Sequence, residues 1–323
     1  MDNKPLLDTI EPDIIDRLSE RRVEIEHGSS ARSGVVAALA LGSVPIAIAA
    51  LSKDVYGMVP TAAIKAVLDF ALALEIFEDE FYKAVLGTSA NTAANNAFAT
   101  VRAAAAAVPG AVATLQQIEK HEAAHRATLL GAGATNVFNL NENSFDFTGA
   151  RGAGNGPFAK ATTDLAFLLE VAQGAEDTGV RAYKGQAGNL MSDPPVLEAA
   201  LRIHSVEARH ASRIRRMRRL AAGAGSTVRL SGTVRGGGAA AAGATDTGPN
   251  PSAVTAAFDK IYGAGANATA APSEANVTHA GVNVSSLASA SFGTDAATEA
   301  FDEPLDRADV VAIVQPFFIP TIS

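Results

Sequence analysis

The sequence of 323 residues contains no cysteine and no tryptophan, and only 6% of its residues are aromatic. Without cysteine the chain cannot form disulfides, thiolate zinc sites, iron–sulfur clusters or thiol nucleophiles. Its chemistry must therefore use carboxylates, imidazoles, hydroxyls or a bound metal. The 26 Lys and Arg are outnumbered by 34 Asp and Glu, which gives a net charge of −8. We expect no nucleic-acid partner, because such binding needs a basic surface.

Changes in composition along the chain predict three parts. They are an N-terminal extension over 1–60, a helical domain over 61–220 and a Gly/Ala-rich C-terminal extension over 221–323. With 48% hydrophobic residues, the chain has enough apolar surface for a core.

An uncharged apolar segment spans 33–52 and is interrupted by Gly42 and Pro45. Three interpretations remain open: the core of an export signal, a membrane anchor, or a retained apolar helix packed within the protein. The preceding Arg21-Arg22 pair is similar to a twin-arginine signal, although Glu24 and Glu26 depart from that pattern. An exported or cell-envelope location is favoured, and a cytoplasmic one is the alternative.

Apolar periodicity predicts four long helices in the central part. They cover Thr61 to Leu86, a stretch after Pro109-Gly110 up to about Leu130, Phe158 to Tyr183, and Pro194 to Leu220. The long connection from Gly131 to Gly156 can join two helical hairpins by one crossover along a bundle.

The last hundred residues are expected to contain little regular structure. Residues 221–251 are rich in Gly and Ala and are typical of a linker. A short helix is predicted over 253–262, and the apolar stretch 301–320 is expected to dock on the bundle or on a neighbouring copy.

The four predicted helices carry a repeated pattern of glutamate, tyrosine and histidine. In chain order the pattern is Glu75 with Tyr82, Glu122 with His125, Glu176 with Tyr183, and Glu207 with His210. Residues three apart, or seven apart, lie on one face of a helix. Every helix thus offers the residue types that a two-metal site requires.

Charge provides a reason for such residues to lie inside a bundle. Each glutamate has apolar neighbours in the sequence, such as Leu74 and Ile76 beside Glu75. Burying an isolated carboxylate costs several kcal/mol. Four glutamates carry a charge of −4, which two divalent cations would neutralise. Carboxylate and imidazole ligands suit iron first and manganese next, and zinc can compete.

The chain resembles the bacterial ferritin-like family of desiccation-related proteins. The segments that carry the resemblance are LDFALALEIFEDEFY (68–82), IEKHEAAH (118–125), GAEDTGVRAYKG (174–185) and HSVEARHASRIR (204–215), with looser similarity at 145–159 and 301–318. The resemblance implies an all-α fold. This fold is a ferritin-like four-helix bundle with one long crossover, to which the sequence adds an N-terminal apolar helix and an irregular C-terminal extension.

The same resemblance implies roles for individual residues. The implied metal ligands are Glu75, Glu122, His125, Glu176, Glu207 and His210, with Glu122 and Glu207 bridging two ions. Tyr82 and Tyr183 are expected to orient the glutamates of the opposite helices by hydrogen bonds.

Four nearby residues are less well placed for the site. Glu78 and Glu119 lie one turn from predicted ligands and are possible extra ligands, as is His204 one turn before Glu207. His121 is rotated by about 100° from Glu122 on the helix and is expected to face elsewhere.

Three functions are consistent with this pattern. The first is an oxidoreductase with a di-metal centre, of ferroxidase, peroxidase or manganese-catalase type. The second is a structural, self-assembling envelope or extracellular protein that uses the bundle as a scaffold, with a structural or vestigial metal site. The third, a storage cage, fits the long extensions less well. We expect a homo-oligomer, and one form consistent with the sequence is an extended assembly ordered through the tails. In the anchor interpretation, residues 33–52 would associate with a membrane.

Overall fold

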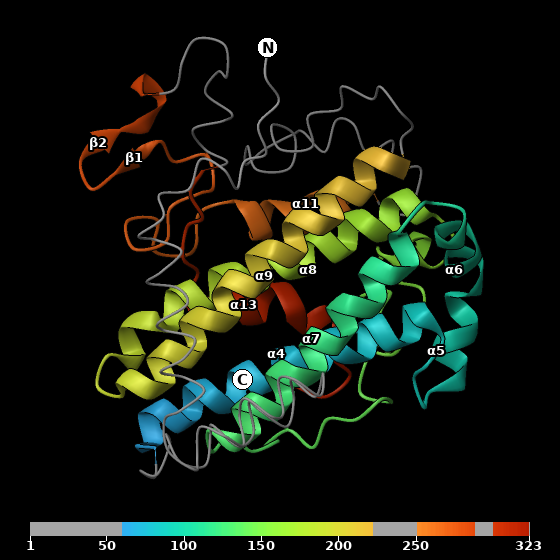
Figure 1. Cartoon of the computed structure of the whole chain (residues 1–323), viewed down its shortest axis with the longest axis horizontal. Coiled ribbons are helices and arrows are strands. Elements are labelled where there is room, and N and C mark those ends of the chain that lie inside the picture. Colours follow the sequence, from blue (N-terminus) through green and yellow to red (C-terminus); the bar gives the residue numbers. More distant parts are fainter. Residues whose placement is uncertain (1–59, 222–250, 288–299, 323) are drawn as a thin grey trace, which may run out of the picture. The chain divides into compact units, whose positions relative to one another are not determined.

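The computed structural model describes residues 60–221, 251–287 and 300–322 (Figure 1). The predicted apolar helix at 33–52 and the linker at 222–250 lie outside the described residues. Four long helices dominate the described part, which confirms the predicted all-α bundle. They are α4 (Ala62–Leu86), α7 (Ala111–Gly131), α8 (Leu165–Gln186) and α9 (Pro194–Ala221).

Local signals in the sequence set the ends of α4. Thr61 Oγ1 accepts a hydrogen bond from the backbone N–H of Ile64 at 3.3 Å, which satisfies one of the free donors of the first turn. The helix stops at Gly87, whose positive φ of 81° is the left-handed conformation that glycine adopts without steric cost. The helix is therefore bounded by its own cap residues.

The third long helix begins later than predicted. The sequence pattern predicted a start near Phe158, whereas α8 begins at Leu165 and a short 3₁₀ helix, η2 (Ala159–Thr162), precedes it. The Asp164 carboxylate accepts a hydrogen bond from Phe167 N at 3.0 Å and so caps the helix at this point. Two further short helices, α5 (Thr92–Ala97) and α6 (Ala99–Ala106), connect α4 to α7.

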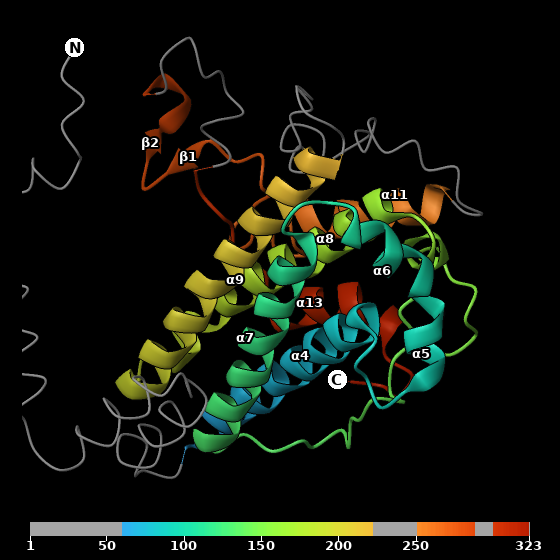
Figure 2. The ribbon, with the colours of Figure 1, turned by 45° about the vertical axis from the view of Figure 1, so that its right-hand side comes forward.

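The long helices pack as two hairpins, α4 with α7 and α8 with α9 (Figures 1 and 2). A long irregular connection from 132 to 158 crosses between the hairpins, as the fold class predicted. The Asp146 carboxylate holds part of this connection in place. It accepts hydrogen bonds from the backbone N–H groups of Thr148 (2.9 Å), Gly152 (2.8 Å) and Gly154 (3.0 Å). These hydrogen bonds satisfy backbone donors that have no partner in a helix or strand, and so they fix the conformation of the loop.

The described part of the C-terminal extension has more regular structure than predicted. It contains α11 (Pro251–Tyr262), the strand pair β1 (Thr278–His279) and β2 (Val282–Asn283), η4 (Val284–Ser286), α13 (Arg307–Val314) and η5 (Gln315–Phe317). Both α11 and α13 pack against α8. Within the described residues, no helix combines the length and the apolar character that crossing a membrane requires.

The end of the chain docks on the crossover. Phe318 pairs with Phe145 in an antiparallel bridge, and Ile319 N donates to Ser144 O at 2.9 Å. The ring of Phe77, on α4, lies 5.8 Å from that of Phe145 and 5.5 Å from that of Phe318. Edge-on and tilted aromatic pairs at these distances join the bundle, the crossover and the C-terminal segment in one apolar core.

A single buried arginine also ties the extension to α8. Arg181 is 1% exposed, and its guanidinium donates to the carbonyl oxygens of Glu303 (2.9 Å), Pro272 (2.9 Å) and Gly263 (3.0 Å). It also lies 3.1 Å from the Glu274 carboxylate. Because guanidinium presents several donors in a fixed plane, one side chain can hold several loop segments at once.

Candidate metal centre

Six acidic and histidine side chains from the four long helices meet inside the bundle. They are Glu75 from α4, Glu122 and His125 from α7, Glu176 from α8, and Glu207 and His210 from α9. All four glutamates are 0% exposed, and the two histidines are also buried. The structure therefore brings together the six residues that the resemblance singled out.

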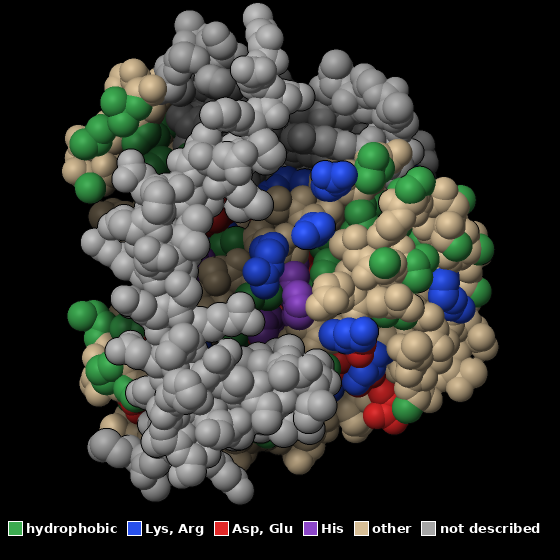
Figure 3. Space-filling model, in the orientation of Figure 1, with side chains coloured by type: hydrophobic (Ala, Val, Ile, Leu, Met, Phe, Trp, Pro, Cys, Tyr) green, Lys and Arg blue, Asp and Glu red, His purple; other side chains and the backbone are tan. Residues whose placement is uncertain are grey.

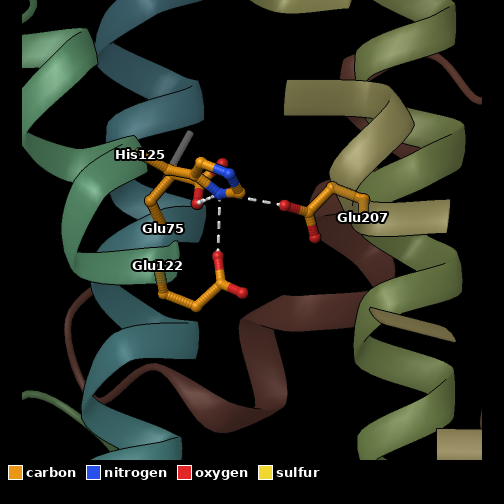
Figure 4. Close-up of side chains that lie close together, drawn as sticks. All are labelled: Glu75, Glu122, His125 and Glu207. Atoms are coloured by element: carbon orange, nitrogen blue, oxygen red, sulfur yellow. Dashed lines mark hydrogen bonds and ion pairs between the residues drawn. The ribbon is translucent and has the colours of Figure 1, made fainter. Parts of the chain in front are cut away.

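The first group of side chains surrounds His125 (Figure 4). Its Nδ1 lies 3.1 Å from Glu75 Oε2, 2.9 Å from Glu122 Oε2 and 3.0 Å from Glu207 Oε1. The three carboxylates come from three different helices and converge on one imidazole nitrogen. Ligand atoms of all four residues lie within 4.8 Å of one another.

The second group surrounds His210 and shares two glutamates with the first. His210 Nδ1 lies 2.8 Å from Glu122 Oε1 and 3.0 Å from Glu176 Oε2. Glu207 completes this group, again with all ligand atoms within 4.8 Å. Each group could hold a metal ion, and Glu122 and Glu207 belong to both groups.

The carboxylate oxygens at this position have few partners. Within the described residues, Glu207 Oε2 is buried without a hydrogen-bond partner, and Glu207 Oε1 and Glu122 Oε1 face only the Nδ1 atoms of His125 and His210. Such atoms are costly unless something compensates them. Cations coordinated by these oxygens would supply that compensation, so the residues present fit a metal-binding site. Mixed carboxylate and imidazole ligands suit iron, manganese or zinc.

The buried carboxylates respond to one another's charge. Burial, followed by the charges of Glu122 and Glu75, raises the pKa of Glu207 well above its ordinary value. Burial also raises the pKa of Glu122. For Glu75 burial acts in the same direction, but the charge and hydrogen bond of His125 outweigh it and lower the pKa. Without metal, protons must balance part of the negative charge.

The two histidines serve as cations in the metal-free centre. Burial alone would lower the pKa of His125, but the charges of Glu75 and Glu122 raise it well above the usual value. For His210 the charge of Glu176 and hydrogen bonds to Glu122 and Glu176 overcome burial and raise the pKa to about 11. A metal ion must displace these protons, because an imidazole binds metal through an unprotonated nitrogen.

The two tyrosines contact the glutamates of the opposite hairpin. Tyr82, on α4, donates its hydroxyl hydrogen to Glu176 Oε1, and Tyr183, on α8, donates to Glu75 Oε1. Burial and these glutamate charges raise the pKa of both phenols well above 10.0, so they remain donors. The reciprocal bonds connect the hairpins and orient one carboxylate in each group.

Three other predicted residues lie outside both groups. Glu78 is buried beside the centre, and burial together with the charges of the four glutamates raises its pKa well above the usual value. Glu119 is half-buried, and burial, followed by the charge of Asp79, raises its pKa. His204 Nδ1 lies 3.0 Å from the Val180 carbonyl oxygen, to which it can donate.

His121 lies outside both groups, but it contacts one of the ligand histidines, which the sequence did not predict. Its Nδ1 lies 2.8 Å from His210 Nε2, and the two rings are nearly parallel, at 10°. A rotation of about 100° on α7 turns the side chain away from Glu122 and toward the interface between α7 and α9. Periodicity within one helix could not show which helix lies there, and no other signal in the sequence marked this contact.

Residues 65–219 match the model of a protein family described as a ferritin-like domain. A search of the curated proteins and a search of the solved structures each found no match. The matched segment runs from the first turn of α4 to the last turn of α9 and includes all six side chains of the two groups. Residues 65–219, which form the four-helix bundle, are therefore a ferritin-like domain.

Proposed function

We propose that this protein holds two divalent metal ions in the bundle, iron in the first place and manganese next, and acts as an oxidoreductase on Fe²⁺, peroxide or oxygen. The observation that supports the proposal is the pair of overlapping ligand groups that share Glu122 and Glu207. Iron or manganese ions, when bound, would supply redox chemistry that the carboxylate and imidazole ligands do not offer by themselves. Zinc would fit the same ligands but would be redox-inactive.

In this proposal the protein itself contributes ligands, orientation and exclusion of water. Glu75 with His125 would hold one ion and Glu176 with His210 the other, and Glu122 and Glu207, which belong to both groups, would serve both. Tyr82 and Tyr183 hold the two terminal carboxylates in place through hydrogen bonds from the opposite hairpin. Apolar side chains beside the ligands, such as Leu72 (1% exposed) and Ile203 (4% exposed), keep bulk water from the centre.

Metal analysis of the purified full chain tests the proposal. We expect two iron or manganese ions per chain in the native protein and at most one in Glu122→Gln and Glu207→Gln. Glu198→Gln is the matched control on α9, because Glu198 is exposed and pairs with Arg202. Loaded protein should oxidise Fe²⁺ or consume hydrogen peroxide, and the two site variants should not. A native protein that binds no transition metal at stoichiometric level would overturn the proposal.

The scaffold function remains the alternative, and the same preparations distinguish it. A purely structural metal would raise the melting temperature without any turnover of Fe²⁺ or peroxide. The similarity to desiccation-related proteins, which is based on the sequence segments alone, is compatible with either function.

We also propose that the protein is a homo-oligomer, because ferritin-like proteins commonly assemble. Light scattering coupled to size-exclusion chromatography measures the mass directly. A particle of the monomer mass, 33.0 kDa, at all concentrations would contradict this.

A further inference from the structure

The His210 ring lies between the centre and the protein surface, and its two nitrogens have different surroundings. Nδ1 faces the carboxylates of Glu122 and Glu176 at 2.8 and 3.0 Å. Nε2 points outward and lies 2.8 Å from Nδ1 of His121, on α7. The near-parallel rings, at 10°, allow an N–H in one ring plane to point at the lone pair in the other.

The contact continues to the surface. His121 Nε2 lies 2.7 Å from the side-chain amide nitrogen of Gln117, one turn earlier on α7. Gln117 is exposed and His121 is half-buried. On the face that Figure 3 shows, histidine side chains come to the surface among Lys and Arg side chains. Because the amide can turn to present either its NH₂ or its oxygen, both tautomers of His121 find a partner.

Metal binding determines the direction of these hydrogen bonds. An ion on Nδ1 of His210 requires a lone pair there, so the ring proton must be on Nε2. That proton needs an acceptor, and Nδ1 of His121 is the atom in place. His121 then carries its own proton on Nε2 and donates it to the Gln117 amide oxygen.

The other ligand histidine has no such arrangement. His125 Nδ1 contacts Glu75, Glu122 and Glu207, but no residue of the described ranges offers a hydrogen-bond partner to its Nε2. A metal-binding histidine whose second nitrogen is hydrogen-bonded is held in one tautomer and one orientation. Removing the hydrogen-bond partner typically lowers metal affinity by about 10–100-fold. The ring of His210 is therefore held by a hydrogen bond at its second nitrogen, whereas the ring of His125 is not held in this way by any described residue.

We propose that His121 is a positioning residue that accepts the Nε2–H of His210, holds this ring with Nδ1 toward the centre, and makes the His210 position the tighter of two metal positions. The inference rests on the proposed di-metal function. It states that the two positions bind metal with different affinities, whereas the proposed function states that both positions exist.

Stepwise titration with Zn²⁺ against a competing chelator tests this in the full-length, metal-free chain. We expect two unequal steps in the unsubstituted protein. In His121→Leu the tighter step should weaken by about 10–100-fold while the weaker step stays the same. His121→Asn should stay within about threefold of the unsubstituted protein, because the Asn carbonyl oxygen can replace the Nδ1 acceptor. His204→Leu is the control, since His204 lies on α9 outside both groups.

A second measurement needs no variant. In the Zn²⁺-loaded protein, ¹⁵N NMR of labelled histidine should show His210 and His121 both protonated at Nε2 and unprotonated at Nδ1. The opposite tautomer of His121 would overturn the inference. So would equal steps in the unsubstituted protein, or His121→Leu and His121→Asn weakening binding equally. Failure of the unsubstituted protein to bind two Zn²⁺ would instead overturn the di-metal function itself.

Discussion

The buried carboxylate of Glu207 lowers the stability of the metal-free protein. Within the described residues its Oε2 is buried without a hydrogen-bond partner, its Oε1 faces only His125 Nδ1, at 3.0 Å, and three other glutamates lie around it. An uncompensated buried polar group of this kind costs roughly 1–3 kcal/mol, and more when it is charged. Such a cost persists at positions where function requires it. Removing the carboxylate should therefore stabilise the protein and impair its metal binding.

We expect Glu207→Gln to raise the free energy of unfolding of the metal-free protein by about 1–3 kcal/mol at pH 8. The amide keeps the shape of the side chain but carries no charge, so repulsion from Glu122 and Glu75 disappears. Urea unfolding followed by circular dichroism measures the change. In Glu198→Gln, on the same helix but exposed, the change should stay within about 0.5 kcal/mol. A destabilised Glu207→Gln would contradict this explanation.

At the scale of elements, the close approach of α8 to α9 depends on a glycine. A Cβ at Gly179 would lie 3.1 Å from Glu207 Oε2, closer than ordinary contact. Glycine in a helix interior costs about 1 kcal/mol relative to alanine. Gly179 thus leaves space for a ligand carboxylate at the expense of helix stability.

Gly179→Ala should accordingly stabilise the metal-free protein by up to about 1 kcal/mol and weaken metal binding, because Glu207 must move away from the new methyl group. Gly188→Ala is the matched control, since a Cβ there meets no atom within 4 Å. Zn²⁺ titration and urea unfolding of both variants give the two readouts. Unchanged metal affinity in Gly179→Ala would show that Glu207 needs no such space.

Arg181 carries the attachment of the C-terminal segments to α8. Arg181→Ala removes the donors to Glu303, Pro272 and Gly263 and the guanidinium that faces Glu274. Removing one partner of a buried ion pair costs about 3–5 kcal/mol, and we expect a loss of this size in thermal or urea unfolding. Arg202→Ala, which breaks an exposed pair, should cost less than about 1 kcal/mol. Similar losses in the two variants would refute the attachment role.

Signals within a single helix made the bundle and the ligand pattern predictable. The apolar periodicity of each helix and the Glu-x-x-His spacing act over a few residues, so sequence alone shows them. Contacts between elements were not predictable in this way. His121 meets His210 across two helices, and Arg181 meets carbonyl groups about a hundred residues away. Periodicity tells which way a side chain points from its own helix, but not what it meets.

At the scale of the whole molecule, metal binding and stability are linked through pH. In the metal-free protein the pKa of His210 is about 11, against 6.5 for the free side chain, because the Glu176 charge and hydrogen bonds outweigh burial. The folded state therefore holds a proton that the unfolded chain releases above pH 6.5. The stability from this group is complete below pH 6.5 and is lost as the pH rises toward 11. Glu207, whose pKa burial raises above 4.5, acts in the same direction.

Under the proposed function, metal ions would replace these protons, so the stabilisation by metal should grow with pH. At a free metal concentration of about 100 times Kd, one site adds about 2.7 kcal/mol. For a domain of about 150–250 residues, this corresponds to a rise of about 5–10 °C in Tm.

Between pH 6.5 and 8.5, we expect the Tm of the metal-free protein to fall while that of the Mn²⁺-loaded protein changes less. Circular dichroism suits the measurement, because the chain has no tryptophan fluorescence. The Tm difference should be smaller at each pH in Glu207→Gln, because this variant is expected to bind at most one ion. A difference that narrows with rising pH in the unsubstituted protein would mean that the buried histidines and carboxylates do not exchange protons for metal.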